Sequence, residues 1–140
     1  MILYLDTSAL VKLYLEEKDS ELVALWVDRV DEVASSVVAY AEACSAFRRA
    51  YGEHRITENE LMFLLETFDA DWKKYTRVGV SQTVLRTARE VILKHGLRGF
   101  DGLHLASAIS MMDLGDEVVF ASFDDKLNKA ASLEGFMVIV

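Results

Sequence analysis

Four acidic residues each lie beside an apolar segment: Asp6, Glu42, Asp101 and Asp124. A fold that buries these segments could bring the four carboxyl groups together into one site. Asp6 ends the run Ile2–Leu5, and Asp124 follows Val118–Phe123, both of which are typical of buried strands. Two like charges about 4 Å apart repel by about 4 kcal/mol at an effective dielectric constant of 20. A cluster of such carboxylates therefore requires a counter-charge, which a divalent cation would supply.

Oxygen ligands of this kind favour Mg²⁺ or Mn²⁺, whereas zinc would require His and Cys at close spacing. The three histidines, His54, His95 and His104, show no such spacing. His104 follows Asp101 by one helical turn and could face the same site, but a helical histidine is more often packed or hydrogen-bonded, and we assign it no catalytic role. Cys44 is the single cysteine, which excludes an intrachain disulfide and fits a cytoplasmic protein.

Each acid also has a structural interpretation. Asp6, Asp101 and Asp124 precede helical segments, and Asp is a preferred N-cap residue worth about 1 kcal/mol. Glu42 lies inside its helix, where its neighbours one turn away are small or apolar, so we expect no base to pair with it. Capping and metal binding both stay open for the aspartates, while Glu42 is the acid that capping cannot explain.

Short strands alternate with longer helices along the chain. The pattern predicts strands at 2–6, 33–35, 77–80, 117–122 and 136–140, and helices at 8–14, 20–30, 37–51, 57–75, 81–95, 101–115 and 125–133. This order indicates an α/β fold with right-handed crossovers and a mostly parallel sheet covered on both faces. Ligands of such sheets bind beyond the carboxyl ends of the strands, where Asp6 and Asp124 fall.

The composition fits one domain over residues 1–140, since the chain is 52% hydrophobic and has the length of a typical domain. Its 23 acidic and 15 basic residues give a net charge of −8, which argues against binding nucleic acid through bulk positive charge. The same acidity suits a basic peptide partner. The first apolar run is broken at Asp6 and lacks a basic leader, so we expect no signal peptide and no membrane span.

Several other chemistries lack their motifs. The sequence has no G-x-x-x-x-G-K-[ST] or G-x-G-x-x-G loop for nucleotides and no G-x-S-x-G elbow for a serine hydrolase. A receiver domain needs an Asp after its central strand, and 77–80 offers none. An aspartyl phosphatase usually carries a second Asp two residues beyond the first, where this chain has Ser8.

The ordered segments Asp6–Lys12, Glu42, Phe100–Ala108 and Ala121–Asp124 resemble those of a PIN domain, and most closely those of VapC-type toxins from bacterial and archaeal toxin–antitoxin pairs. The resemblance covers the whole chain from residue 2 to 140. It implies a single PIN domain with a five-stranded parallel sheet flanked by helices, and a Mg²⁺- or Mn²⁺-dependent endoribonuclease.

The resemblance also implies roles for individual residues. It gives the acidic positions of the site to Asp6, Glu42, Asp101 and Asp124, as catalytic residues and metal ligands. Thr7 and Ser122 match the hydroxyl positions beside the first and last acids, although Thr is frequent where this chain has Ser122. The tandem of Asp124 and Asp125 leaves the fourth ligand open, and the spacing from Ser122 favours Asp124.

The expected reaction is hydrolysis of phosphodiester bonds in single-stranded RNA, with metal-bound water as the nucleophile. Lys12, Arg98 and Lys126 are the basic residues nearest the acids in sequence, so each is a candidate for phosphate contact or a solvated helix terminus. The resemblance further implies a homodimer and a small antitoxin whose basic tail enters the acidic cleft. The apolar helices at 23–30 and 61–68 would supply such interfaces or belong to the core.

Two alternative functions stay open at this point. A housekeeping RNA-processing PIN nuclease would cleave RNA without a small partner protein and without marked toxicity. A non-catalytic PIN module that binds RNA or protein would keep the fold alone, and the complete set of four acids counts against it.

Overall fold

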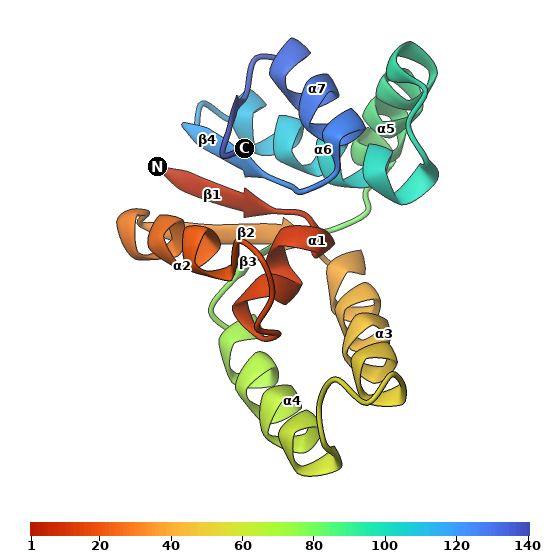
Figure 1. Cartoon of the computed structure of the whole chain (residues 1–140). Coiled ribbons are helices and arrows are strands. Elements are labelled where there is room, and N and C mark those ends of the chain that lie inside the picture. Colours follow the sequence, from red (N-terminus) through yellow and green to blue (C-terminus); the bar gives the residue numbers. More distant parts are fainter.

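A five-stranded parallel sheet forms the centre of the computed structural model, which describes residues 1–140 (Figure 1). The strands lie in the order β3-β2-β1-β4-β5, and every neighbouring pair is parallel. Their bounds are β1 Ile2–Leu5, β2 Glu32–Ser36, β3 Thr76–Val78, β4 Val118–Ala121 and β5 Met137–Val138. The fold class and the parallel sheet expected from the sequence are therefore confirmed.

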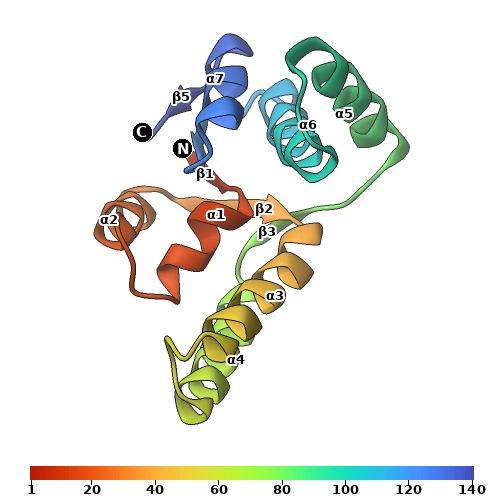
Figure 2. The ribbon, with the colours of Figure 1, turned by 45° about the vertical axis from the view of Figure 1, so that its right-hand side comes forward.

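The helices divide between the two faces of the sheet, with α1 to α4 on one side and α5 to α7 on the other (Figures 1 and 2). Right-handed crossovers explain the division, because the chain steps from β1 through β2 to β3 in one direction and then returns to add β4 and β5 on the other side of β1. The helical bounds are α1 Thr7–Leu10, a 3₁₀ turn η1 Val11–Leu13, α2 Ser20–Arg29, α3 Val38–Gly52, α4 Glu58–Trp72, α5 Gln82–His95, α6 Gly99–Asp113 and α7 Asp125–Leu133.

Side-chain caps set several of these bounds as the sequence predicts. Thr57 and Glu60 form a reciprocal capping box at the start of α4. Ser81 accepts a hydrogen bond from the backbone of Val84 and so begins α5, and Gly96 ends that helix in the left-handed region with φ of 69°.

Three expected elements differ from the structure. Asp101 does not open a helix, because the backbone is already helical from Gly99 and Arg98 holds the extended N-cap position. The helix expected at 8–14 is a single α turn followed by η1. The last strand keeps only Met137–Val138, since β5 is an edge strand with one neighbour to pair with.

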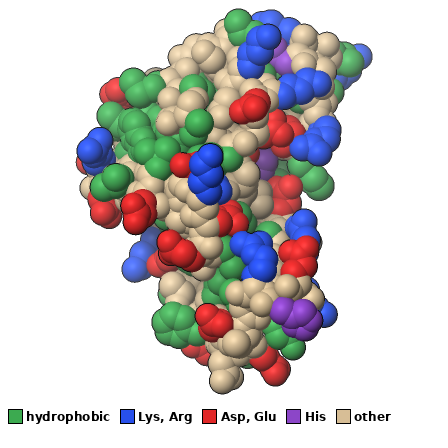
Figure 3. Space-filling model, viewed as in Figure 1, with side chains coloured by type: hydrophobic (Ala, Val, Ile, Leu, Met, Phe, Trp, Pro, Cys, Tyr) green, Lys and Arg blue, Asp and Glu red, His purple; other side chains and the backbone are tan.

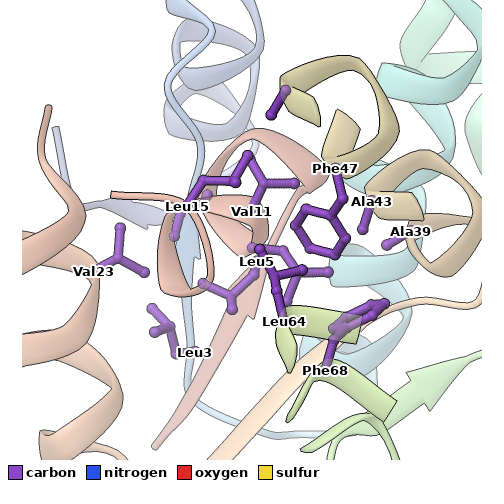
Figure 4. Packing of buried hydrophobic residues seen from close by; sticks show 14 of the residues in the cluster. Leu3, Leu5, Val11, Leu15, Val23, Ala39, Ala43, Phe47, Leu64 and Phe68 are labelled. Atoms are coloured by element: carbon purple, nitrogen blue, oxygen red, sulfur yellow. The ribbon is translucent and has the colours of Figure 1, made fainter. Parts of the chain in front are cut away.

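The central strand β1 is fully buried and supplies both halves of the core. Leu3 and Leu5 pack among α1 to α4, and Figure 4 shows Leu3 on the side of Val23 and Leu5 near Phe47 and Leu64. Tyr4 points to the opposite face and joins the cluster beneath α6 and α7. This alternation follows from the two-residue period of a strand, and it explains why β1 reads as a continuous apolar run.

Helices α3 and α4 extend away from the sheet as an arm (Figures 1 and 2). Phe68 of α4 packs against Phe47 and Tyr40 of α3, with ring centroids 5.4 and 5.3 Å apart. The apolar stripe at 61–68 is therefore partly core, as its Phe68 shows. Its remaining part is surface, because Met62 and Phe63 are 56% and 72% exposed.

Helices α5 and α6 approach each other closely at Gly102. A Cβ atom added there would lie 2.2 Å from Cγ1 and 2.6 Å from Cδ1 of Ile92 on α5. Gly102 thus lets α6 lie against α5 at the start of the helix that carries Asp101. The position costs helix propensity but permits the contact.

We predict that Gly102→Ala lowers the free energy of unfolding by about 1 kcal/mol, since overpacking costs about 1–3 kcal/mol and the gain in helix propensity returns about 1 kcal/mol. In an Ile92→Ala background, where the overlapping atoms are gone, the same change should stabilise the protein. Chemical denaturation of the unmodified protein, the two single variants and the double variant measures both signs. The control is Gly99→Ala, at an open position in the first turn of the same helix, which should raise stability by up to about 1 kcal/mol because no contact opposes the gain in helix propensity.

A second tie between helices joins the end of α5 to the end of α7. Glu134 accepts hydrogen bonds from Lys94 Nζ at 2.8 Å and pairs with His95 Nε2 at 2.7 Å. The hydrogen bonds from Lys94 and then His95 hold the pKa of Glu134 below its usual value. A carboxyl whose pKa is lowered in the folded state stabilises the protein above its unfolded pKa and loses that effect as the pH falls through its folded pKa.

We therefore expect Glu134→Gln to destabilise the protein by about 0.5 kcal/mol at pH 7, the size typical of an exposed pair. The difference from the unmodified protein should shrink as the pH falls below about 4.3, the usual pKa of an unfolded glutamate, and should vanish only below the lowered folded-state pKa, where the carboxyl is protonated in both states. Unfolding curves across this pH range test the expectation. Glu90→Gln, at an exposed glutamate of α5 without an ion pair, is the matched control. A Glu134→Gln effect that persists at acid pH would show that packing, not charge, is responsible.

Candidate functional site

The site lies where β1 and β4 end side by side. Leu5 pairs with Ala121 in the parallel register, so the next residues, Asp6 and Ser122, are neighbours. Ser122 Oγ donates a hydrogen bond to Asp6 Oδ2 at 2.6 Å. The predicted convergence of the first and last acidic segments at the carboxyl edge of the sheet is thus present.

Asp6 is a buried carboxylate with 4% of its surface exposed. Its Oδ1 accepts hydrogen bonds from Ala9 N at 2.9 Å and Ser8 Oγ at 2.7 Å, so the residue caps α1. Burial raises the pKa of Asp6, although Ser122 and Ser8 act in the opposite direction. Capping uses one carboxylate oxygen and Ser122 binds the other, so Asp6 is both a helix cap and a buried charge at the site.

Glu42 enters the site from α3. Its Oε1 accepts hydrogen bonds from Thr7 Oγ at 2.6 Å and from His104 Nε2 at 3.0 Å. The expectation that no base pairs with Glu42 is therefore wrong, because the partner comes from α6 and not from its own helix. Burial acts to raise the pKa of Glu42, but the hydrogen bonds from His104 and Thr7 outweigh it and the pKa is lowered.

Asp101 and Asp124 share one cationic neighbour. Arg98 Nε lies 3.4 Å from Asp101 Oδ2, and Arg98 Nη2 lies 3.5 Å from Asp124 Oδ2. Asp124 also caps α7 by accepting a hydrogen bond from Leu127 N at 2.9 Å. Capping is thus confirmed for Asp6 and Asp124, whereas Asp101 lies inside the first turn of α6 with its carboxylate toward Arg98.

Glu42 and Asp101 border a groove of about 900 Å³ between α5 and α6, and Figure 3 shows acidic side chains in the recess above the α3–α4 arm with basic side chains close by. Glu42 and Phe100 also border a second hollow, of about 710 Å³, on the α1–α3 side. The other residues lining the groove are largely apolar, with two arginines: Leu85, Ala88, Arg89, Ile92, Leu93, Arg98, Gly99, Phe100 and Leu103.

The donor atoms of this site suit a hard divalent cation. As the side chains stand, no group of three or more acidic, histidine or cysteine side chains is placed to hold a metal ion. Mg²⁺, however, is usually bound through one or two carboxylates, several waters and substrate phosphates, and not by a cage of protein ligands. The guanidinium of Arg98 shows that Asp101 and Asp124 accommodate a positive charge between them. The residues present therefore fit a hydrated divalent cation.

The basic residues expected near the acids fall in different places. Arg98 lies in the site, but Lys12 Nζ bonds to the carbonyl of Lys18 at 2.8 Å and to Glu17 at 3.3 Å, so it is engaged elsewhere. Lys126 is exposed on α7. The sequence interpretation missed Arg89, which lines the groove with the apolar side chains of α5.

The sequence interpretation also assigned no role to His104, whose ring lies within hydrogen-bonding distance of Glu42 and Thr7. The spacing of one helical turn from Asp101 was the available signal. Nothing local in the sequence indicates that Glu42 would be its partner.

The chain is similar to known proteins along nearly its whole length. The PIN domain family model matches residues 3–133. Ribonuclease VapC49 of Mycobacterium tuberculosis is 37% identical over 138 residues, which cover 98% of this chain and 94% of that protein. Ribonuclease VapC35 of the same organism is 26% identical, covering 99% and 96% of the two chains.

Two solved structures share the fold. The crystal structure of FitAcB from Neisseria gonorrhoeae matches with a TM-score of 0.68 at 19% identity, covering 99% of this chain and 96% of that one. Mycobacterium tuberculosis VapC20, described as a sarcin-ricin loop cleaving toxin, matches with a TM-score of 0.67 at 17% identity, covering 96% of each chain. None of the helices combines the length and the apolar composition that a membrane span requires.

We predict that Asp6→Asn raises the free energy of unfolding by about 1 kcal/mol in EDTA, because the amide removes a buried charge while keeping the hydrogen bond that caps α1. Thermal unfolding in EDTA at neutral pH measures the change. Asp125→Asn, at an exposed residue, is the control and should leave stability within about 0.5 kcal/mol. A clear loss of stability in Asp6→Asn would indicate that Asp6 serves the fold more than the site.

Proposed function

Because the chain belongs to the PIN domain family, we propose that it is a metal-dependent endoribonuclease and the toxin of a toxin–antitoxin pair. The observation that carries the proposal is a set of contacts that links acids from separate elements: Glu42 and Asp101 line one groove, and Arg98 lies between Asp101 and Asp124. Asp6 follows β1, Glu42 comes from α3 and Asp124 precedes α7, while Asp101 lies in the first turn of α6. The name ribonuclease, borne by a relative that is 37% identical, supports this choice of chemistry.

In this proposal the metal is Mg²⁺ or Mn²⁺, and its ligands come from Asp6, Glu42, Asp101 and Asp124. When bound, such a cation supplies an activated water and neutralises the charge that develops on the phosphate oxygens. Thr7 and Ser122 orient two of these carboxylates by hydrogen bonds of 2.6 Å to Glu42 and Asp6. Hydroxyl groups that hold ligands in this way commonly tune affinity and activity.

The side chains around the acids suit a single-stranded RNA. Arg98 and Arg89 border the groove and can neutralise phosphates of the backbone. Phe100, at the start of α6, is 55% exposed, so its ring is available for a base to stack on. These local groups compensate for the overall charge of −8, which by itself disfavours nucleic acid.

The proposed partners are a small antitoxin with a basic tail and a second copy of this chain. Arg98 supports the first, because its guanidinium between Asp101 and Asp124 marks a position that an arginine of another protein can take. Exposed apolar side chains support interfaces, among them Phe63 of α4 and Leu93 of α5, each 72% exposed. As an enzyme that acts on cellular RNA, the protein is expected in the cytoplasm.

Cleavage of a labelled structured RNA by the purified protein tests the proposal. We expect cutting in Mg²⁺ or Mn²⁺, none in EDTA, and none by Asp6→Asn. Expression should arrest growth only with an intact site. Cleavage without growth arrest would favour a housekeeping nuclease, and RNA binding without metal-dependent cleavage would favour a non-catalytic module.

The choice between the tandem acids gives a sharper prediction. Asp124→Asn should reduce the cleavage rate by about 100-fold, because Asp124 lies 3.5 Å from Arg98, which lines the groove, while Asn still caps α7. Asp125→Asn, at an exposed side chain, should cleave at the original rate. Initial rates at saturating metal give the comparison, and the reverse order of effects would place the fourth acid at Asp125.

A further inference from the structure

A buried polar pair lies between β1 and α6, in surroundings that do not require it. Tyr4 is fully buried and stacks on Phe120 with ring centroids 5.5 Å apart, within the apolar cluster under α6 and α7. Its hydroxyl lies 2.8 Å from His104 Nδ1, and His104 is only 2% exposed. Apolar side chains of similar size would fill this space without burying polar groups. Packing alone therefore does not account for the pair.

The other nitrogen of the same imidazole reaches the acidic site. His104 Nε2 lies 3.0 Å from Glu42 Oε1 and 3.2 Å from Thr7 Oγ. A carboxylate only accepts hydrogen bonds, so the network assigns a proton to Nε2 and leaves Nδ1 of the neutral ring to accept from the Tyr4 hydroxyl. The hydrogen bonds then run in one direction, from Tyr4 through His104 to Glu42.

The network uses only one of the two carboxylate oxygens of Glu42. Both of its donors, Thr7 Oγ and His104 Nε2, bind the same oxygen, Oε1. The other oxygen is left without a protein donor on a residue that borders the groove. The His104 bond also crosses the sheet edge, because α6 and α3 lie on opposite faces (Figure 1). It thus fixes a side chain of one half of the molecule from the other half.

We propose that Tyr4 and His104 are positioning residues that hold Glu42 in its working orientation, Tyr4 by fixing the tautomer and rotation of the imidazole, and His104 by donating to Oε1. The inference rests on the proposed function, in which Glu42 belongs to the metal site. Neither residue touches the substrate. His104, for which no role was predicted from sequence patterns, thus supports the site.

Kinetics of variants test the proposal. Tyr4→Phe removes one oxygen and keeps the stacked ring, so it should fold, and its kcat should fall about 10-fold with KM unchanged. His104→Leu should lose about 100-fold in kcat, and His104→Gln, which keeps an N–H donor, should lie between His104→Leu and the unmodified protein. Tyr14→Phe is the matched control, because it removes another tyrosine hydroxyl that is hydrogen-bonded, to Asp71 at 2.8 Å, on the other face of the sheet. It should cleave at the original rate.

A second readout does not depend on cleavage. Long-range ¹H–¹⁵N spectra should show His104 with its proton on Nε2 in the unmodified protein and a mixture of tautomers in Tyr4→Phe. Mn²⁺ titration by calorimetry should show about 10-fold weaker binding in His104→Leu. A proton on Nδ1, or equal kcat in Tyr4→Phe and the unmodified protein, would overturn the proposal.

Failure of the proposed function gives a different pattern. If the unmodified protein cuts no RNA with either metal, the ribonuclease assignment fails. The tautomer of His104 and the Mn²⁺ affinity then still test whether Tyr4 and His104 position Glu42. Unchanged Mn²⁺ affinity in His104→Leu would then reject it. A loss of activity in Tyr14→Phe equal to that in Tyr4→Phe would show a general effect of destabilisation and would also reject it.

Discussion

The carboxylate of Asp6, buried at the end of the central strand, is the constraint around which the site is arranged. Taking a charge out of water costs several kcal/mol unless hydrogen bonds or a counter-charge compensate. Here the donors are the backbone of Ala9 and the hydroxyls of Ser8 and Ser122. They tie α1 to the strand that precedes it and tie the turn after β4 to β1. The compensation of one buried charge therefore also fixes the backbone on which a second acid, Asp124, is mounted.

Strand β1 contributes to the site through the side chain of Tyr4 as well as through Asp6, the residue that follows the strand. Leu3 and Leu5 anchor it among α1 to α4, whereas Tyr4 faces α6 and contacts His104. Because the helices of the two faces approach the same sheet edge from opposite sides, α3 delivers Glu42 and α6 delivers Asp101 to one recess. A sheet with helices on one face alone would have no such meeting point, so the crossover topology is a condition for the acidic cluster.

The fold and the choice of acidic residues could be predicted from the sequence, whereas most contacts of these acids could not. Periodicity and N-caps such as Thr57 and Ser81 are local, and they predicted most elements because the contacts that begin a helix lie within one turn. The partner of Glu42 lies 62 residues away, so no spacing rule identifies it. The same applies to Arg98, whose contact with Asp124 depends on how α6 and α7 are placed together. Such pairings become visible only when the sheet order is known.

Under the proposed function, three kinds of cation have reason to occupy the same electrostatic position. The acids of the site repel one another, and Arg98 offsets this repulsion between Asp101 and Asp124 with an 83% exposed side chain that water screens. A divalent ion neutralises the same carboxylates more strongly, and a basic tail from a partner protein would compete for them through bidentate hydrogen bonds. A site built to attract a metal therefore also attracts an arginine-bearing inhibitor. The acidity that enables catalysis is, on this argument, the same property that makes the enzyme easy to restrain.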